Sequence, residues 1–105
     1  MANEPMKAPP AYREFIARFP HLGEAWDLMR KAESAGPLDG KTQRLLKLAI
    51  AVGREAEGAT HSGVRKALHA GATHQEIEQV VALCASTLGL PATVKINRWV
   101  REVLD

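Results

Sequence analysis

Apolar residues recur along most of the chain at the three- and four-residue spacing of amphipathic helices. One such pattern begins at Tyr12 and is ended by Pro20, which cannot continue a helix. A second follows with the apolar positions Leu22, Ala25, Trp26 and Met29. Nowhere do apolar and polar residues alternate as in a half-buried strand. The pattern therefore predicts an all-α fold of about six helices.

Turn residues divide the middle of the chain. The sequence SAGPLDGK predicts a turn in which Gly36 adopts a positive φ and Pro37 stops helix propagation. Asp39 is expected to cap the helix that follows. Residues 41–57 are apolar over a wide arc, which indicates a central helix. We attribute the bend after it to Gly53 and Gly58.

The second half carries stronger boundary signals. A helix of roughly residues 59–70 is expected to end at Gly71 in a left-handed conformation. Thr73 and Glu76 have the spacing of a capping box, in which each side chain accepts from the other residue's backbone N–H. A last helix is predicted over residues 92–104.

Length and composition favour one domain. The chain has 105 residues, of which 46% are apolar and 5% aromatic, so its core must be built from small aliphatic side chains. Three prolines near the start predict a flexible arm over residues 1–11, followed by the helical domain over residues 12–105.

Charge and cysteine content narrow the function classes. The net charge of +2 arises from mixed acidic and basic residues, which does not indicate a nucleic-acid partner. No apolar run is long enough for a membrane span and no secretory signal is visible, so we expect no membrane partner and a cytoplasmic location. The single Cys84 cannot form an internal disulfide and is expected to be buried. His69 and His74 lack partners at metal-ligand spacing, so no metal is assigned.

The sequences GPLDGKTQRLLKLAIAV, HSGVRKALHAGATHQEIEQVVAL and LGLPA together resemble the carboxymuconolactone decarboxylase-like family, which includes the AhpD-type alkylhydroperoxidases. The similarity runs from about Tyr12 to the C-terminus. It implies an AhpD-like helical domain that forms homo-oligomers, as a trimer or a hexamer. No cofactor is implied.

The peroxidase relay of that family is missing from this sequence. The family glutamate position is occupied by Arg44, and the two cysteine positions fall on Ala56 and Ala59. The family histidine falls on Gly63. Because a dithiol peroxidase needs one thiolate to attack and a second thiol to resolve, AhpD-type peroxidase (peroxiredoxin) activity can apply only as a family label. Decarboxylase members also lack the cysteines, so lactone chemistry stays open.

His61 is the one histidine that lies close in sequence to the missing relay positions 56, 59 and 63. An imidazole gains and loses a proton close to neutral pH, which suits general acid–base catalysis. Glu57 precedes it by four residues and would orient the ring if one helix holds both. The alternative is a surface or capping histidine paired with a glutamate. Small residues around position 63 either leave room for a pocket or allow close helix approach, which we place at a subunit contact.

Arg44 and Glu55 are the candidate substrate-binding residues. Arg44 stands where the family places a pocket-facing glutamate, and its guanidinium would hold a substrate carboxylate through two hydrogen bonds. The alternative is that Arg44 extends to solvent or pairs with Glu55 or Glu57.

Two functions follow from the resemblance and these residues. The first is carboxymuconolactone decarboxylase-like lyase chemistry, a proton transfer or decarboxylation on a small carboxylated or lactone substrate. His61 would act as acid–base and Arg44 as carboxylate anchor. The second is a catalytically inactive, oligomeric binding or scaffold member of the family.

Overall fold

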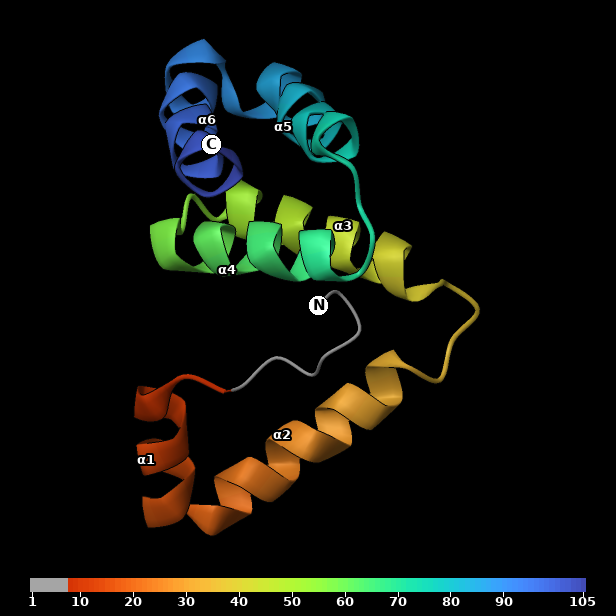
Figure 1. The fold of residues 1–105 in the computed structure, drawn as a ribbon, viewed down its shortest axis with the longest axis vertical. Helices are drawn as coiled ribbons and strands as arrows, with labels where there is room; N and C mark the ends of the chain where they lie inside the picture. The colour runs from red at the N-terminus through yellow and green to blue at the C-terminus, as the bar shows by residue number, and fades with distance from the viewer. Residues whose placement is uncertain (1–7) are drawn as a thin grey trace. The chain divides into compact units, whose positions relative to one another are not determined.

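The computed structural model describes residues 8–105, which form six helices and no strand (Figure 1). The helices are α1 Pro10–Arg18, α2 Pro20–Glu33, α3 Gly40–Gly53, α4 Glu57–His69, α5 His74–Leu88 and α6 Leu90–Leu104. The predicted all-α class is confirmed. Most of the arm predicted over residues 1–11 lies outside the described residues. Residues 10–11 belong to α1, because the fixed φ of Pro10 suits the first turn of a helix. Within residues 8–105 no helix has the length and apolar character needed to cross a bilayer.

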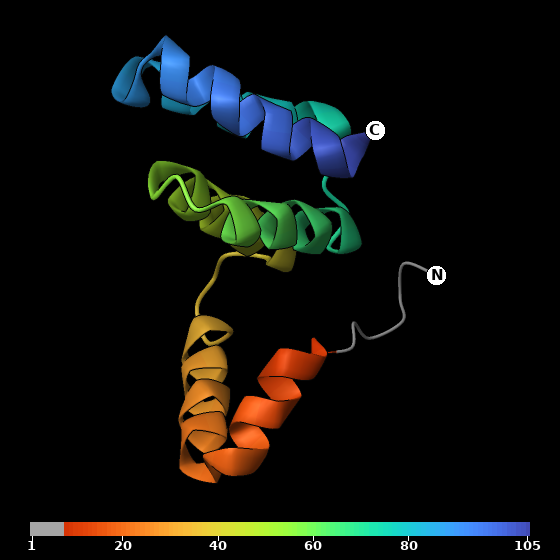
Figure 2. The same cartoon turned by 90° about the vertical axis from the view of Figure 1, so that its left-hand side faces the viewer.

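The chain divides into two compact units, of which the first ends at Leu38 and consists of α1 and α2. Figure 2 shows these two helices diverging from the turn at Phe19. Near that turn the rings of Phe15 and Phe19 lie 5.2 Å apart, and Gly23 packs against Ile16. Gly23 is the buried residue of this unit, so most of its apolar side chains stay open to solvent.

The second unit, Asp39–Asp105, holds the hydrophobic core. α3 and α4 form one layer, and α5 and α6 lie over it as a second layer (Figure 1; Figure 2). The buried core residues come from all four helices and the turn between α4 and α5: Leu48, Val52, Val64, Ala67, Ala72, Ile77, Val81, Ile96, Trp99 and Val100. Small aliphatic side chains predominate, as the composition predicts.

α3 ends earlier than the sequence predicts, because Glu55 adopts a left-handed conformation with φ of 52°. Its N–H donates to the carbonyl of Val52, and the N–H of Ala56 donates to the carbonyl of Ala51. These two bonds form a Schellman motif. The attribution of this bend to Gly53 and Gly58 was wrong, since neither has a positive φ.

α4 also ends in a Schellman motif, and here the left-handed residue is a glycine, as the sequence predicts. Gly71 has a φ of 97°, and the N–H groups of Gly71 and Ala72 donate to the carbonyls of Leu68 and Ala67. The predicted left-handed glycine is confirmed. The positive φ predicted for Gly36 was wrong, because among the described glycines only positions 71 and 89 have one.

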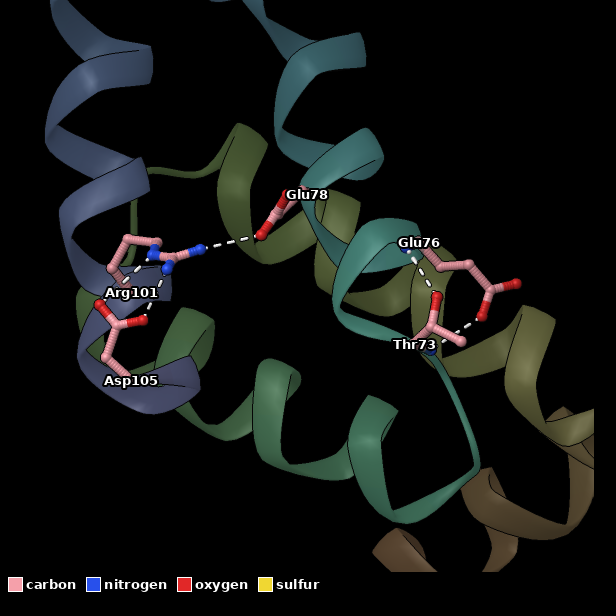
Figure 3. A network of polar contacts seen from close by, with 5 residues as sticks. All are labelled: Thr73, Glu76, Glu78, Arg101 and Asp105. Carbon is pink, nitrogen blue, oxygen red and sulfur yellow. Dashed lines mark hydrogen bonds and ion pairs between the residues drawn. The ribbon is translucent and has the colours of Figure 1, made fainter.

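Capping residues start α3 and α5 as predicted. Asp39 accepts a hydrogen bond from the Thr42 N–H at 2.8 Å. Thr73 and Glu76 form the complete capping box, with bonds of 3.0 and 2.8 Å (Figure 3). Glu76 also accepts from the Lys41 ammonium at 2.9 Å, which ties α5 to α3. The bond from the Thr73 backbone N–H, followed by that from Lys41, holds the pKa of Glu76 below its usual value.

Arg101, near the C-terminus of α6, joins α6 to the N-terminal half of α5 (Figure 3). It donates to Glu78 of α5 at 2.8 Å and to Asp105 at 2.6 and 3.3 Å. These exposed bonds fix the orientation of the guanidinium, although surface pairs of this kind contribute only about 0–1 kcal/mol.

Gly63 allows α4 to approach α3 closely. A Cβ at this position would lie 3.1 Å from Leu48 Cδ1 and 3.4 Å from Leu48 Cα. Close packing is therefore the reason for this glycine, as one of the two sequence interpretations proposed. The contact lies within one chain, however, and it leaves no room for a pocket at residue 63.

We expect Gly63→Val to destabilise the protein by about 1–3 kcal/mol, because its Cβ would lie only 3.1 Å from Leu48 Cδ1 and its two further methyl groups would crowd a residue whose Cα and Cβ are already in contact. Gly58 is the matched control, since a Cβ there meets nothing within 4 Å. Gly58→Ala should stabilise α4 by about 0.5–1 kcal/mol through helix propensity. Urea unfolding of the two variants measures both effects, and an unchanged midpoint for Gly63→Val would contradict the close approach.

The capping box predicts a pH dependence. The lowered pKa means that ionised Glu76 stabilises the fold above its unfolded pKa of about 4.3, and this contribution is lost as pH falls through the folded value. Glu76→Gln should therefore be less stable than wild type at neutral pH and approach it in acid. Thr73→Ala should cost about 1 kcal/mol with little change over that range. Urea unfolding between neutral and acidic pH separates the two, and parallel curves for Glu76→Gln and wild type would refute the linkage.

Candidate functional site

His61 lies on α4 and is held by a residue from the far end of the sequence. Its Nε2 is 3.1 Å from Oε1 of Glu102 on α6, and 24% of the His61 side chain is exposed. Glu57, the predicted partner, lies one turn earlier on α4, but the ring bonds to Glu102 instead. The expected glutamate–histidine pair is therefore present with a different glutamate.

This contact determines which ring nitrogen is available for chemistry. A carboxylate accepts hydrogen bonds, so Nε2 donates its proton to Glu102. The neutral ring then carries its lone pair on Nδ1. The bond to Glu102 fixes the orientation of the ring and leaves Nδ1 as the nitrogen that can exchange a proton with a substrate.

Glu55 is bound to α6 through Lys95. The Lys95 ammonium donates to Glu55 Oε1 at 2.8 Å and stands 5.4 Å from the centre of the Trp99 ring. Lys95, Trp99 and Glu102 follow one another at four and three residues, so they share a face of α6. That face meets α4 and the turn before it, and we call this boundary the α4–α6 seam.

Two buried polar atoms belong to the same pair of helices. Thr60 Oγ1 on α4 and Trp99 Nε1 on α6 have no hydrogen-bond partner within the part of the chain that is described. Thr60 is fully buried and Trp99 is 6% exposed. An indole N–H and a hydroxyl without partners are unusual in a core. Both atoms belong to helices that form the seam.

Arg44 and His61 do not lie close together in the structure. α3 and α4 run antiparallel (Figure 1), and the contact of Leu48 with Gly63 sets their register. In that register Arg44 lies about 9 Å from the level of His61 along the helix axes. Arg44 is half-buried, and Glu55, one of its predicted partners, pairs with Lys95 instead. The four predicted site residues are thus divided between the seam and the opposite end of α3.

A groove between α3 and α5 is the feature that the sequence interpretation missed. Its volume is about 540 Å³. It is lined by Thr42, Leu45, Leu46, Ala49, Gly53, Glu76, Gln79, Val80, Leu83, Cys84, Thr87 and Leu88. Cys84 is half-buried in its wall rather than fully buried as predicted. The exposed leucines on both helices were the available signal, but periodicity alone assigns such residues to a core. None of the four predicted site residues lines this groove.

A model of the carboxymuconolactone decarboxylase family matches residues 20–102, from the first residue of α2 nearly to the end of α6. None of the curated proteins and none of the solved structures matches the chain. The family match covers both His61 and Glu102, together with the α3–α5 groove.

The left-handed Glu55 yields a test of the turn that positions the seam. Glu55→Gly should be more stable than Glu55→Ala by about 1 kcal/mol, because only glycine adopts a positive φ without strain. Both variants lose the ion pair with Lys95, so their difference isolates the backbone. Thermal unfolding of the two variants measures it. Equal stability would show that this position carries no strain.

Proposed function

This chain belongs to the carboxymuconolactone decarboxylase family, and on that basis we propose that it catalyses proton transfer coupled to decarboxylation on a small carboxylated or lactone substrate. The observation that carries the proposal is the bond between His61 and Glu102. It gives a histidine in the family's reactive segment the fixed orientation that acid–base catalysis requires.

His61 would act through Nδ1. Decarboxylation breaks the bond between the substrate carbon and its carboxylate, and a conjugated carbonyl accepts the electron pair. The imidazolium of His61 then donates the Nδ1 proton to the resulting anion. Glu102 holds Nε2 throughout and is a positioning residue, since it touches the ring and not the reacting atoms.

Two cations are candidates for the substrate carboxylate. Lys95 lies on the face of α6 that carries Glu102, and its ammonium is bonded to the half-exposed Glu55. Arg44 keeps its proposed role only if the substrate extends along α3. Glu55 would then act indirectly, by competing with the substrate for Lys95. Glu57, the acidic residue in the first turn of α4, lies one turn before His61 and would remain beside the reacting ring.

A catalytically inactive binding or scaffold member is the second candidate. The observation that favours it is the absence of His61 from the lining of the α3–α5 groove and of the hollow between α1 and α2. Such a member would bind a partner through its apolar surfaces as a homo-oligomer. Peroxidase chemistry has the least support, because Gly63, at the family histidine position, is packed against Leu48.

The decisive measurement follows the loss of ultraviolet absorbance of 4-carboxymuconolactone. We expect His61→Ala to slow turnover at least tenfold, which corresponds to about 1.4 kcal/mol of barrier. His69→Ala is the matched control, since His69 is an exposed histidine on the same helix, and it should retain activity within about twofold. Lys95→Ala and Arg44→Ala distinguish the two anchors, because loss of the anchor raises KM.

Glu102→Gln tests the positioning role. The amide keeps the size of the carboxylate but no longer holds Nε2 through a charged acceptor, so kcat should fall while KM changes little, as expected of a group that orients the ring and does not touch the substrate. Turnover no faster than buffer with the wild-type protein would refute this substrate and favour the binding member. Measurable hydroperoxide turnover with a dithiol donor would instead overturn our exclusion of peroxidase chemistry.

A further inference from the structure

Thr60 and Trp99 carry the two buried side-chain atoms that have no hydrogen-bond partner within residues 8–105. Thr60 on α4 is fully buried, and Trp99 on α6 is 6% exposed. A hydroxyl or an indole N–H that loses its bonds to water on folding destabilises the protein unless another group replaces them. Folded proteins satisfy almost all such atoms, either with protein groups or with ordered water. The two atoms therefore indicate a polar site inside the α4–α6 seam.

Two contacts fix how α4 lies against α6. Lys95 on α6 donates to Glu55 in the turn before α4, and Glu102, later on α6, bonds to His61 on α4. The chain advances by six residues from Glu55 to His61 and by seven from Lys95 to Glu102. The two helices therefore run in the same direction (Figure 2).

This register brings the two unpartnered atoms to one section of the seam. His61 lies opposite Glu102, so Thr60 lies opposite the position before it on α6. Trp99 is two positions earlier still, which is about 3 Å along the helix. Because α4 packs on α6 and both side chains are buried, the two residues lie in the interior at nearly the same level of these helices.

The chemistry of the two atoms limits what can occupy the site. They do not bond to each other, since each would then have a partner. The indole N–H only donates, so its partner must accept, whereas the hydroxyl both donates and accepts. Both atoms are enclosed, which excludes a large molecule. An ion would lack a counter-charge, because the nearby Lys95 and Glu102 already have partners. A small neutral molecule that donates and accepts fits these conditions.

We propose that one internal water molecule bridges α4 and α6 between Trp99 Nε1 and Thr60 Oγ1. The indole N–H donates to the water oxygen, and the water forms its second bond with the Thr60 hydroxyl. This water joins the two helices that carry His61 and Glu102, one residue from the histidine in sequence. Its role is structural, since it is enclosed and touches no substrate.

Thr60→Val tests the proposal through the direction of its effect on stability. Valine has nearly the shape of threonine but forms no hydrogen bond. Because the substitution removes one of two partners of the water and leaves the indole N–H unsatisfied, the unfolding equilibrium constant in urea should rise at least about fivefold. A variant that is as stable as the wild type, or more stable, would overturn the proposal, since deleting a hydroxyl that has no partner removes an unfavourable group.

Thr87→Val is the matched control for this measurement. Thr87 is exposed on another helix, α5, so its hydroxyl is hydrated by bulk solvent. The same change of hydroxyl to methyl should alter its unfolding equilibrium constant by no more than about twofold. Thr60→Ser, which keeps the hydroxyl, should retain the water although it loses a methyl group.

Nuclear magnetic resonance of the full-length protein observes the water itself. The chain has two tryptophans, and Trp26 is 45% exposed, so its indole N–H is the reference for contact with bulk solvent. Trp99 Hε1 should show an Overhauser effect to water whose signs in the laboratory and rotating frames are those of a long-lived bound molecule. The effect should persist in Thr60→Ser and disappear in Thr60→Val. Its absence from the wild type, or its persistence in Thr60→Val, would refute the bridge.

A crystal structure of the wild-type protein locates the site independently. We expect a water peak within hydrogen-bond distance of both Trp99 Nε1 and Thr60 Oγ1. Well-defined side chains without such a peak would also overturn the proposal. None of these measurements uses a substrate, so they are independent of whether the protein catalyses decarboxylation.

Discussion

The close approach of α3 and α4 at Leu48 and Gly63 is the contact on which the second unit depends. It sets the register of two antiparallel helices that a three-residue turn connects, and these helices form the layer beneath α5 and α6. α6 packs on α4, so the position of α4 in turn determines which α6 residues face His61. A large side chain at residue 63 would press on Leu48 and push α3 and α4 apart, which would change that alignment.

The turn between α3 and α4 shows how local strain is maintained by distant contacts. A left-handed glutamate is uncommon, and the chain has the usual glycine in the equivalent position after α4. Glu55 nevertheless gains the bond with Lys95, which links the turn to α6. Glycine at residue 55 would relieve the strain and lose this connection. The backbone outlier therefore belongs to the seam that holds the candidate acid–base pair, where strained residues often occur.

The sequence correctly predicted the features that depend on residues close together in the chain. The Asp39 cap, the capping box of Thr73 and Glu76 and the left-handed Gly71 each involve groups within a few residues, and all three are confirmed. The sequence did not predict contacts between residues far apart in the chain. The partner of His61 is 41 residues away, and helical spacing offered Glu57 as a nearer candidate. Such a partner depends on how two helices cross, which a single sequence does not reveal. The end of α3 was also missed, because its left-handed residue is a glutamate.

The arrangement of the four helices of the second unit separates the α4–α6 seam from the α3–α5 groove. α3 packs on α4 and on α5, while α6 packs on the same two helices from the other side, so the four form a closed ring in cross-section. The α4–α6 seam and the α3–α5 groove are opposite edges of that ring. The unpaired buried atoms Thr60 Oγ1 and Trp99 Nε1 belong to the helices of the seam, whereas the exposed Leu46 and Leu83 line the groove. A ligand in the groove would therefore leave the His61–Glu102 pair uncovered, because the groove and the pair lie on different pairs of helices.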